Sequence, residues 1–157
     1  TISQIQEKCI GDRQNDYYVI STISKALQLM VPVASARSLG LRSVGDEDGL
    51  RQTLSDCCAA PLRPVEKDLR VRQTGMREEL KSGDYERVAD VVCQLYYMGT
   101  QRTLGTVDRQ LLDQGKDLLS SELAAAAEVD LDAARQEVED WLATMTPDEQ
   151  DEQPAAE

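Results

Sequence analysis

Residues 80–95 read LKSGDYERVADVVCQL, and they contain the end of one helix and the start of the next. Gly83 can adopt the left-handed conformation that closes a helix, and Asp84 can cap the following helix by accepting a backbone N–H. The apolar residues that follow are spaced at i, i+3, i+4 and i+7, on one face of a helix; they are Val88, Val91, Val92 and Leu95. The stretch therefore predicts a helical hairpin whose second helix lies in a core.

Helical periodicity extends on both sides of this stretch. We expect five helices, over residues 46–58, 65–82, 84 to about 100, 106–128 and 130–142. Pro64 should open the second, and the expected caps are Asp46 or Asp48 for the first, Asp84 for the third and Asp130 for the fifth. On the second helix, Leu69, Met76 and Leu80 fall near one face. The fourth should carry the largest apolar stripe, which consists of Leu111, Leu112, Leu118, Leu119 and Leu123.

The first 44 residues have a different pattern. Three short runs rich in β-branched and aromatic residues, 2–10, 16–23 and 27–33, predict strands, and an extended piece over 39–44 would make a fourth. Pro32 indicates that the third run is an edge strand or ends there. The pattern predicts an α+β protein with a small β domain over residues 1–44 and a helical domain over residues 45–145.

The charge distribution is uneven along the 157 residues. Residues 1–102 carry 14 basic and 14 acidic residues, whereas residues 103–157 carry 3 and 15, so the last third holds the whole net charge of −12. Residues 146–157 should form a disordered acidic tail. Bulk attraction cannot bring such a protein to nucleic acid, so any contact with DNA must come from a local basic face.

The sequence offers little for catalysis. It has no histidine, no glycine-rich phosphate loop and no nucleophile elbow, and its four cysteines lack the spacing of a disulfide framework or a zinc site. No signal peptide or membrane span is recognisable. We therefore expect a cytoplasmic protein with reduced thiols and no cofactor or metal, and not an enzyme.

Basic residues concentrate between Arg63 and Arg87. Lys67, Arg70 and Arg77 could share one helix face and meet a phosphate backbone. Because acidic residues are interleaved with them, a helix laced with ion pairs is the alternative interpretation, and composition alone favours it.

Several strings resemble the CarD/CdnL family of bacterial RNA-polymerase-binding transcription regulators. They are VPVASARSLGLR at 31–42, LKSGD at 80–84, VADVV at 88–92 and LLSSELAAA at 118–126, with Tyr17 and Val19 in the second strand. The resemblance covers nearly all of residues 2–142. The order of the strings is more specific than any one of them.

The resemblance implies a two-domain adaptor without catalytic activity. A small Tudor/SH3-like β barrel, similar to that of transcription-repair coupling factors, would bind the polymerase β subunit, and the helical domain would contact promoter DNA in the minor groove at the upstream edge of the bubble. Binding would stabilise the open complex. The implied polymerase-binding residues are Lys8, Leu27, Leu29 and Met30, and the implied DNA-binding residues are Leu69, Arg70, Arg72 and Arg109.

Three departures from the family pattern bear on these expectations. The family's first strand, which carries a Pro and a His-Gly, is absent before Ile2, so the barrel would lack it if the native protein has one. Leu69 stands where the family has a wedge tryptophan, and leucine can still act as an apolar wedge. Val71 and Thr74 stand at positions that are basic in other members, which predicts weaker DNA contact.

Two alternatives remain open from the sequence. A divergent adaptor could bind polymerase without productive DNA contact, and a generic helical protein-interaction module would have no connection with transcription. The sequence decides neither between activation and repression nor which promoters are involved.

Overall fold

The computed structural model describes residues 2–10, 13–21, 28–39 and 41–145. The N-terminal part is an antiparallel sheet in the order β1-β2-β3, with β1 at Ile2–Ile10, β2 at Arg13–Ser21 and β3 at Gln28–Pro32. The three predicted strands are confirmed. Strand β2 begins earlier than its apolar run because the backbone ladder with β1 continues through polar residues to the pair Ile10 and Arg13. Leu27 and the expected tail, residues 146–157, lie outside the described residues.

The predicted fourth strand over residues 39–44 is wrong. After β3 the chain forms a 3₁₀ turn, η1, at Val33–Ser35, and residues 41–46 then run without regular structure to the first helix. Two of their backbone N–H groups are bonded elsewhere, since Leu41 N–H donates to the Ala36 carbonyl and Gly45 N–H donates to Glu122. Backbone that is bonded in this way is not available for a strand ladder.

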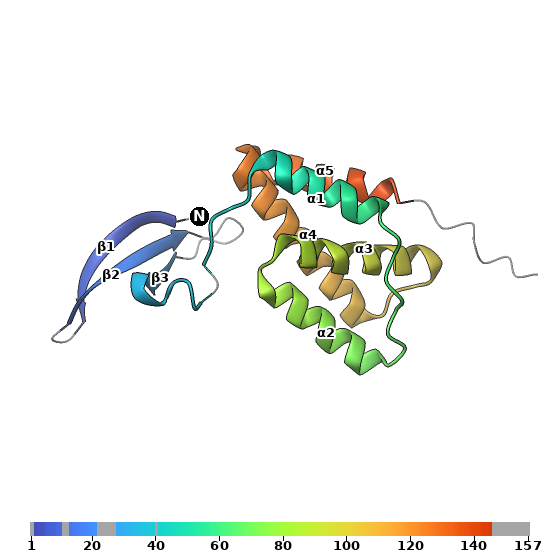
Figure 1. Cartoon of the computed structure of the whole chain (residues 1–157), viewed down its shortest axis with the longest axis horizontal. Coiled ribbons are helices and arrows are strands. Elements are labelled where there is room, and N and C mark those ends of the chain that lie inside the picture. The colour runs from blue at the N-terminus through green and yellow to red at the C-terminus, as the bar shows by residue number, and fades with distance from the viewer. Residues whose placement is uncertain (1, 11–12, 22–27, 40, 146–157) are drawn as a thin grey trace, which may run out of the picture.

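Five helices follow, as predicted, and Figure 1 shows them as a bundle beside the sheet. They are α1 (Glu47–Ala59), α2 (Leu69–Ser82), α3 (Tyr85–Gln101), α4 (Thr106–Ala127) and α5 (Leu131–Ala143). Asp46 and Asp84 cap α1 and α3 through side-chain hydrogen bonds, as expected, whereas Asp130 stands at the N-cap of α5 without a side-chain cap hydrogen bond. No helix within the described ranges is long and apolar enough to cross a membrane.

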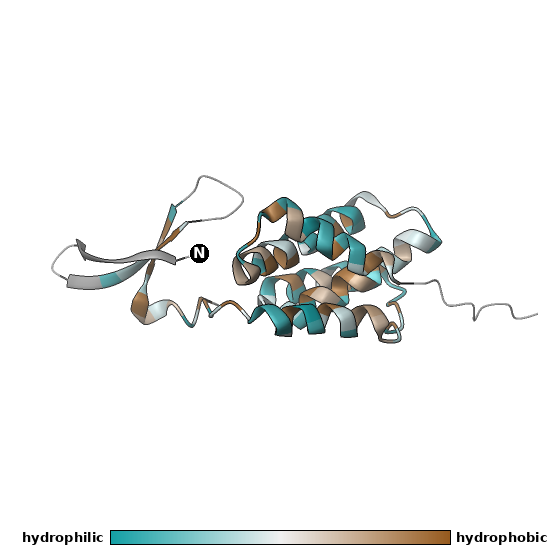
Figure 2. Ribbon diagram, turned by 90° about the horizontal axis from the view of Figure 1, so that it is seen from above, coloured by the Kyte–Doolittle hydropathy of each residue, from teal (hydrophilic) through white to brown (hydrophobic). Residues whose placement is uncertain are grey.

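Helix α3 lies inside the bundle, with α4 as its most extensive neighbour. It packs against α1, α2 and α4, and the four residues of its predicted stripe, Val88, Val91, Val92 and Leu95, are all buried. Figure 2 shows hydrophobic and hydrophilic residues on the same helices, as expected where one face is in a core and the other in water. Gly115 lets α4 approach α3 closely, because a β-carbon there would lie 2.4 Å from Val92 Cγ2.

Helix α2 differs from its prediction in two ways. It begins at Leu69 and not near Val65, because Asp68 supplies the cap by accepting hydrogen bonds from the N–H groups of Arg70 and Val71. Its core face consists of Arg72, Met76 and Leu80, whereas Leu69 is exposed. On α4, Leu118 is likewise exposed and Gly115 takes a place on the buried face.

Candidate functional site

The first turn of α2 presents apolar side chains to solvent. Leu69 is 53% exposed and Val71 59% exposed, on either side of the exposed Arg70. Apolar side chains at a helix start normally pack inward, but here Asp68 fixes the turn through two hydrogen bonds of 2.9 and 3.0 Å. Leu69 is therefore held on a defined turn with about half of its surface exposed to solvent.

Arg72 lies beneath this turn and not on it. Its side chain is 7% exposed, and its Nη2 donates to Asp108 Oδ2 at 2.9 Å. Asp108 is equally buried and accepts a second bond from Gln73 Nε2 at 2.8 Å. Arg72 was expected to contact DNA, but its guanidinium is engaged in joining the first turn of α2 to the first turn of α4.

This buried ion pair brings a loop against Leu69. A shallow hollow beside Leu69 is also lined by Arg102, Thr103 and Leu104, which connect α3 to α4. Arg109 follows one turn into α4, where its Nη2 lies 3.4 Å from the Leu104 carbonyl. We call Leu69, Arg70, Arg102 and Arg109 the Leu69 surface. Sequence spacing could not have identified Arg102, because only the packing of α4 against α2 brings its loop to Leu69.

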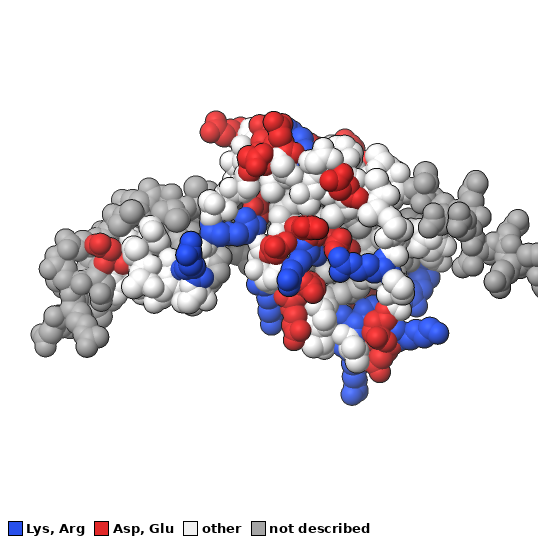
Figure 3. Space-filling view, in the orientation of Figure 1, with Lys and Arg blue, Asp and Glu red and all other residues white. Residues whose placement is uncertain are grey.

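Several cations on α2, on the segment before it and around the start of α4 have no acidic partner in the described part of the chain. Among the residues that the structure describes, Lys67, Arg70, Arg77, Arg102 and Arg109 form no ion pair. Figure 3 shows basic side chains, with acidic neighbours, along the lower edge where α2 lies, whereas the upper edge over α1 and α5 is mostly acidic. The free cations favour a surface for an anion over the alternative of a helix laced with ion pairs.

The sheet offers a second exposed feature. Strand β3 is an edge strand of the described sheet, and its Leu29 and Met30 are 46% and 38% exposed. They lie opposite Ile20 and Val19 of β2, respectively. Lys8, on β1, lies opposite Asn15. The structure thus places Leu29 and Met30 together on one strand edge, while Lys8 belongs to the strand on the other side of β2.

Three cysteines gather where α1 meets α3. The Sγ atoms of Cys58 and Cys93 are 3.8 Å apart, and their hydrogen bond lowers the pKa of Cys58 and raises that of Cys93. Burial, with the charge of Asp90, raises the pKa of Cys57 to about 12. No group of three or more metal-ligating side chains is arranged to hold a metal ion in the described part of the chain.

A larger groove, of about 1000 Å³, runs between the segment after α1 and helices α2 and α3. Its charged lining is of both signs and includes Arg63 and Asp90, whose side chains pair at 2.7 Å. Six of its nine charged lining residues are acidic, so the groove does not favour an anionic ligand.

A helical bundle with an exposed apolar side chain among free cations, preceded by a small sheet with an exposed edge, has the surfaces of a binding protein. The model of the CarD C-terminal domain matches residues 59–139, a little over half of the chain. The protein belongs to the CarD family. The match contains α2, α3 and α4, and hence the whole Leu69 surface.

The similarity to one relative extends beyond the helical domain toward the N-terminus. The protein of Bacillus subtilis (strain 168) named "Putative transcription factor YdeB" is 26% identical over 129 residues, which is 78% of this chain and 79% of that protein. Together the two findings define a CarD-like transcription regulator. Proteins of this family are in general not enzymes.

Proposed function

We propose that the protein binds the β subunit of bacterial RNA polymerase through its sheet and stabilises the promoter open complex through the Leu69 surface. The observation that carries the proposal is the exposed Leu69 on a capped helix turn, next to Arg70, which forms no ion pair with any residue that the structure describes. An apolar side chain can enter a base step while neighbouring cations hold the phosphates on either side. A transcription regulator of this kind would act in the cytoplasm.

The polymerase contact would use the edge of β3. An exposed strand edge can pair with a strand of another protein, with the side chains of Leu29 and Met30 giving specificity. Leu27, which directly precedes β3, remains part of the proposed contact; Lys8, which lies on β1 across β2 from that edge, remains in it only because the family resemblance implies it. If β3 is the contact, Met30→Asp should abolish retention of the chain on purified polymerase. Leu39→Asp is the matched control, because Leu39 is 65% exposed in the turn after η1 and lies outside the strand.

The DNA contact can be tested with neighbouring exposed residues. Leu69→Ala should shorten the lifetime of open complexes, whereas Val71→Ala should leave it unchanged, because Val71 is as exposed but lines the groove on the other side of the turn. The effect of Leu69→Ala on duplex binding should be smaller, since a wedge acts on melted DNA. Equal effects of the two substitutions on open-complex lifetime would contradict the proposed wedge.

The phosphate contacts should appear in the salt dependence. Arg70→Ala and Arg109→Ala should each lower the slope of log affinity against log salt by about 0.9. Arg102 is added to this set by its place beside Leu69. Arg72 is better assigned a structural role beneath the Leu69 surface, because its guanidinium is buried against Asp108 and joins α2 to α4.

A second candidate is a divergent adaptor that binds polymerase without productive DNA contact. It is favoured by the buried position of Arg72, by Val71 and Thr74 where other members have basic residues, and by the net charge of −12. Open-complex lifetime separates the two candidates, because only the first predicts a longer lifetime that depends on Leu69.

A further inference from the structure

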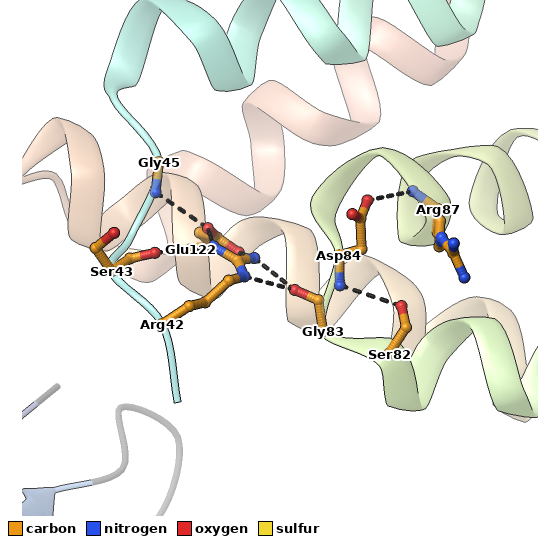
Figure 4. A network of polar contacts seen from close by, with 8 residues as sticks. All are labelled: Arg42, Ser43, Gly45, Ser82, Gly83, Asp84, Arg87 and Glu122. Atoms are coloured by element: carbon orange, nitrogen blue, oxygen red, sulfur yellow. Dashed lines mark hydrogen bonds and ion pairs between the residues drawn. The ribbon is translucent and has the colours of Figure 1, made fainter. Parts of the chain in front are cut away.

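Three segments that are distant in the sequence meet at one arginine (Figure 4). Arg42 Nη1 and Nη2 donate to Glu122 Oε1 and Oε2 at 2.6 and 2.7 Å, and Nε and Nη2 donate to the Gly83 carbonyl at 2.8 and 2.6 Å. Arg42 comes from the connection between sheet and helices, Gly83 from the end of α2, and Glu122 from α4. Each belongs to one of the sequence strings, 31–42, 80–84 and 118–126, that resemble the CarD family.

The Gly83 carbonyl is available because α2 ends there. Gly83 has a φ of 71° and closes the helix, and the last carbonyls of a helix have no partner within it. Arg42 supplies such a partner with two N–H groups. On its other side the same guanidinium makes a bidentate bond with the carboxylate of Glu122, whose side chain is 17% exposed. This bond raises the pKa of Arg42.

Hydrogen bonds restrain the backbone both before and after Arg42. Toward the sheet, Leu41 N–H donates to the carbonyl of the buried Ala36 at 3.0 Å, and η1 contacts β2. Toward the helices, Gly45 N–H donates to Glu122 Oε1 at 3.2 Å, and Asp46 caps α1. Leu41 is thus bonded to the turn that follows η1, and Arg42, the next residue, is bonded to the helical bundle.

We propose that Arg42 is a positioning residue, which holds the sheet in one orientation relative to the helices through Glu122 and the Gly83 carbonyl. This inference rests on the proposed function, since its purpose would be to let the β3 edge and the Leu69 surface engage polymerase and DNA at the same time. Two linked contacts reinforce each other only when the link places both on their targets. Among the residues that the structure describes, the strands have no extensive contact with the helices, so the bond network would supply that placement.

The physical part of the inference is testable without polymerase. Backbone ¹⁵N relaxation of the full chain should give one rotational correlation time for the residues of β2 and of α3. In Arg42→Ala and in Glu122→Gln, β2 should tumble faster than α3. Arg63→Ala is the control, because Arg63 also pairs with a carboxylate, Asp90, but within the helical bundle. If β2 and α3 still shared one correlation time in both Arg42→Ala and Glu122→Gln, the inference would be overturned.

The functional part uses the same variants. Arg42→Ala should retain binding to polymerase and to duplex DNA, but should shorten open-complex lifetime by roughly ten-fold, less than the ~100-fold gain of ideally placed linked sites, because the chain still tethers them. Arg42→Lys, which keeps one charged donor for Glu122, should recover part of the lifetime. Uncoupled tumbling with an unchanged lifetime would overturn the positioning role.

The two proposals fail in distinguishable ways. If the wild-type chain neither binds polymerase nor lengthens open-complex lifetime, the proposed function fails, while the relaxation measurement still decides whether Arg42 orients the sheet. If the wild-type chain does both and the Arg42 and Glu122 variants behave like it in both assays, only the positioning role fails.

Discussion

Replacing Arg72 with alanine should lower the free energy of unfolding by about 3–5 kcal/mol, the usual cost of removing one partner of a buried ion pair. We expect a loss of this size because the Arg72–Asp108 ion pair is buried. The side chains of Arg72 and Asp108 are 7% and 5% exposed, and in the variant the Asp108 carboxylate would keep only the Gln73 amide as a partner. A buried carboxylate that has lost its cation is costly because water cannot replace the lost interaction.

Urea denaturation followed by circular dichroism measures this change. Arg70→Ala is the matched control, since the neighbouring arginine is exposed and should change the unfolding free energy by no more than about 0.5 kcal/mol. Replacing both charges, as in Arg72→Met with Asp108→Leu, should cost less than Arg72→Ala alone, because no unpaired buried charge remains. A loss below about 1 kcal/mol for Arg72→Ala would refute the reasoning. Loss of transcription activity in this variant is therefore weak evidence for a DNA contact.

Three further predictions concern residues of the bundle. Gly115→Ala should destabilise it by about 1–3 kcal/mol in the same urea assay, because the added methyl group meets Val92; a neutral result would contradict the close approach of α3 and α4. Gly83→Ala should cost about 1 kcal/mol because of the positive φ, whereas Gly75→Ala, inside α2 with open space around it, should be neutral or stabilise by up to about 1 kcal/mol; equal effects would contradict the left-handed cap. Cys58 should be the first of the three bundle thiols to react with iodoacetamide near neutral pH, because its lowered pKa favours the thiolate; peptide mass spectrometry that found another thiol modified first would contradict this assignment.

The parts of the fold that the sequence predicted are those set by local patterns. The stripe on α3 was confirmed because four apolar residues at helical spacing can be buried together in only one way, and the caps at Asp46 and Asp84 depend on residues within one turn. The start of α2 was missed because two signals competed. Proline at 64 suits a first helical turn, but the side-chain acceptor that satisfies the N–H groups is Asp68.

The parts that sequence patterns missed depend on contacts between distant residues. Arg72 falls on the core face of α2, and only the arrival of Asp108 on α4 makes that position suitable for a charge. The segment at 39–44 has the composition of a strand, but Arg42 and Gly45 are bonded to Glu122, about 80 positions away along the chain. Arg102 lies beside Leu69 because α4 packs against α2, which is also a contact between residues distant in the sequence.

Among the expected site residues, Leu69 and Arg70 are exposed on the first turn of α2, and Arg109 lies one turn into α4 with its side chain at the Leu104 carbonyl, whereas Arg72 is buried. Leu29 and Met30 lie on an exposed strand edge, whereas Leu27 lies outside the described residues. The family resemblance is confirmed by the match to the CarD C-terminal domain. The polymerase and DNA contacts themselves, and the domain boundary between residues 44 and 45, stay predictions.

The most direct test is the lifetime of open complexes that purified bacterial RNA polymerase forms on a linear promoter fragment, measured after adding a competitor, with and without the wild-type chain. The proposed function predicts a longer lifetime in its presence, and loss of that gain in Leu69→Ala but not in Val71→Ala. An unchanged lifetime at concentrations where the chain is retained on polymerase would contradict it and leave the adaptor without DNA contact as the better description.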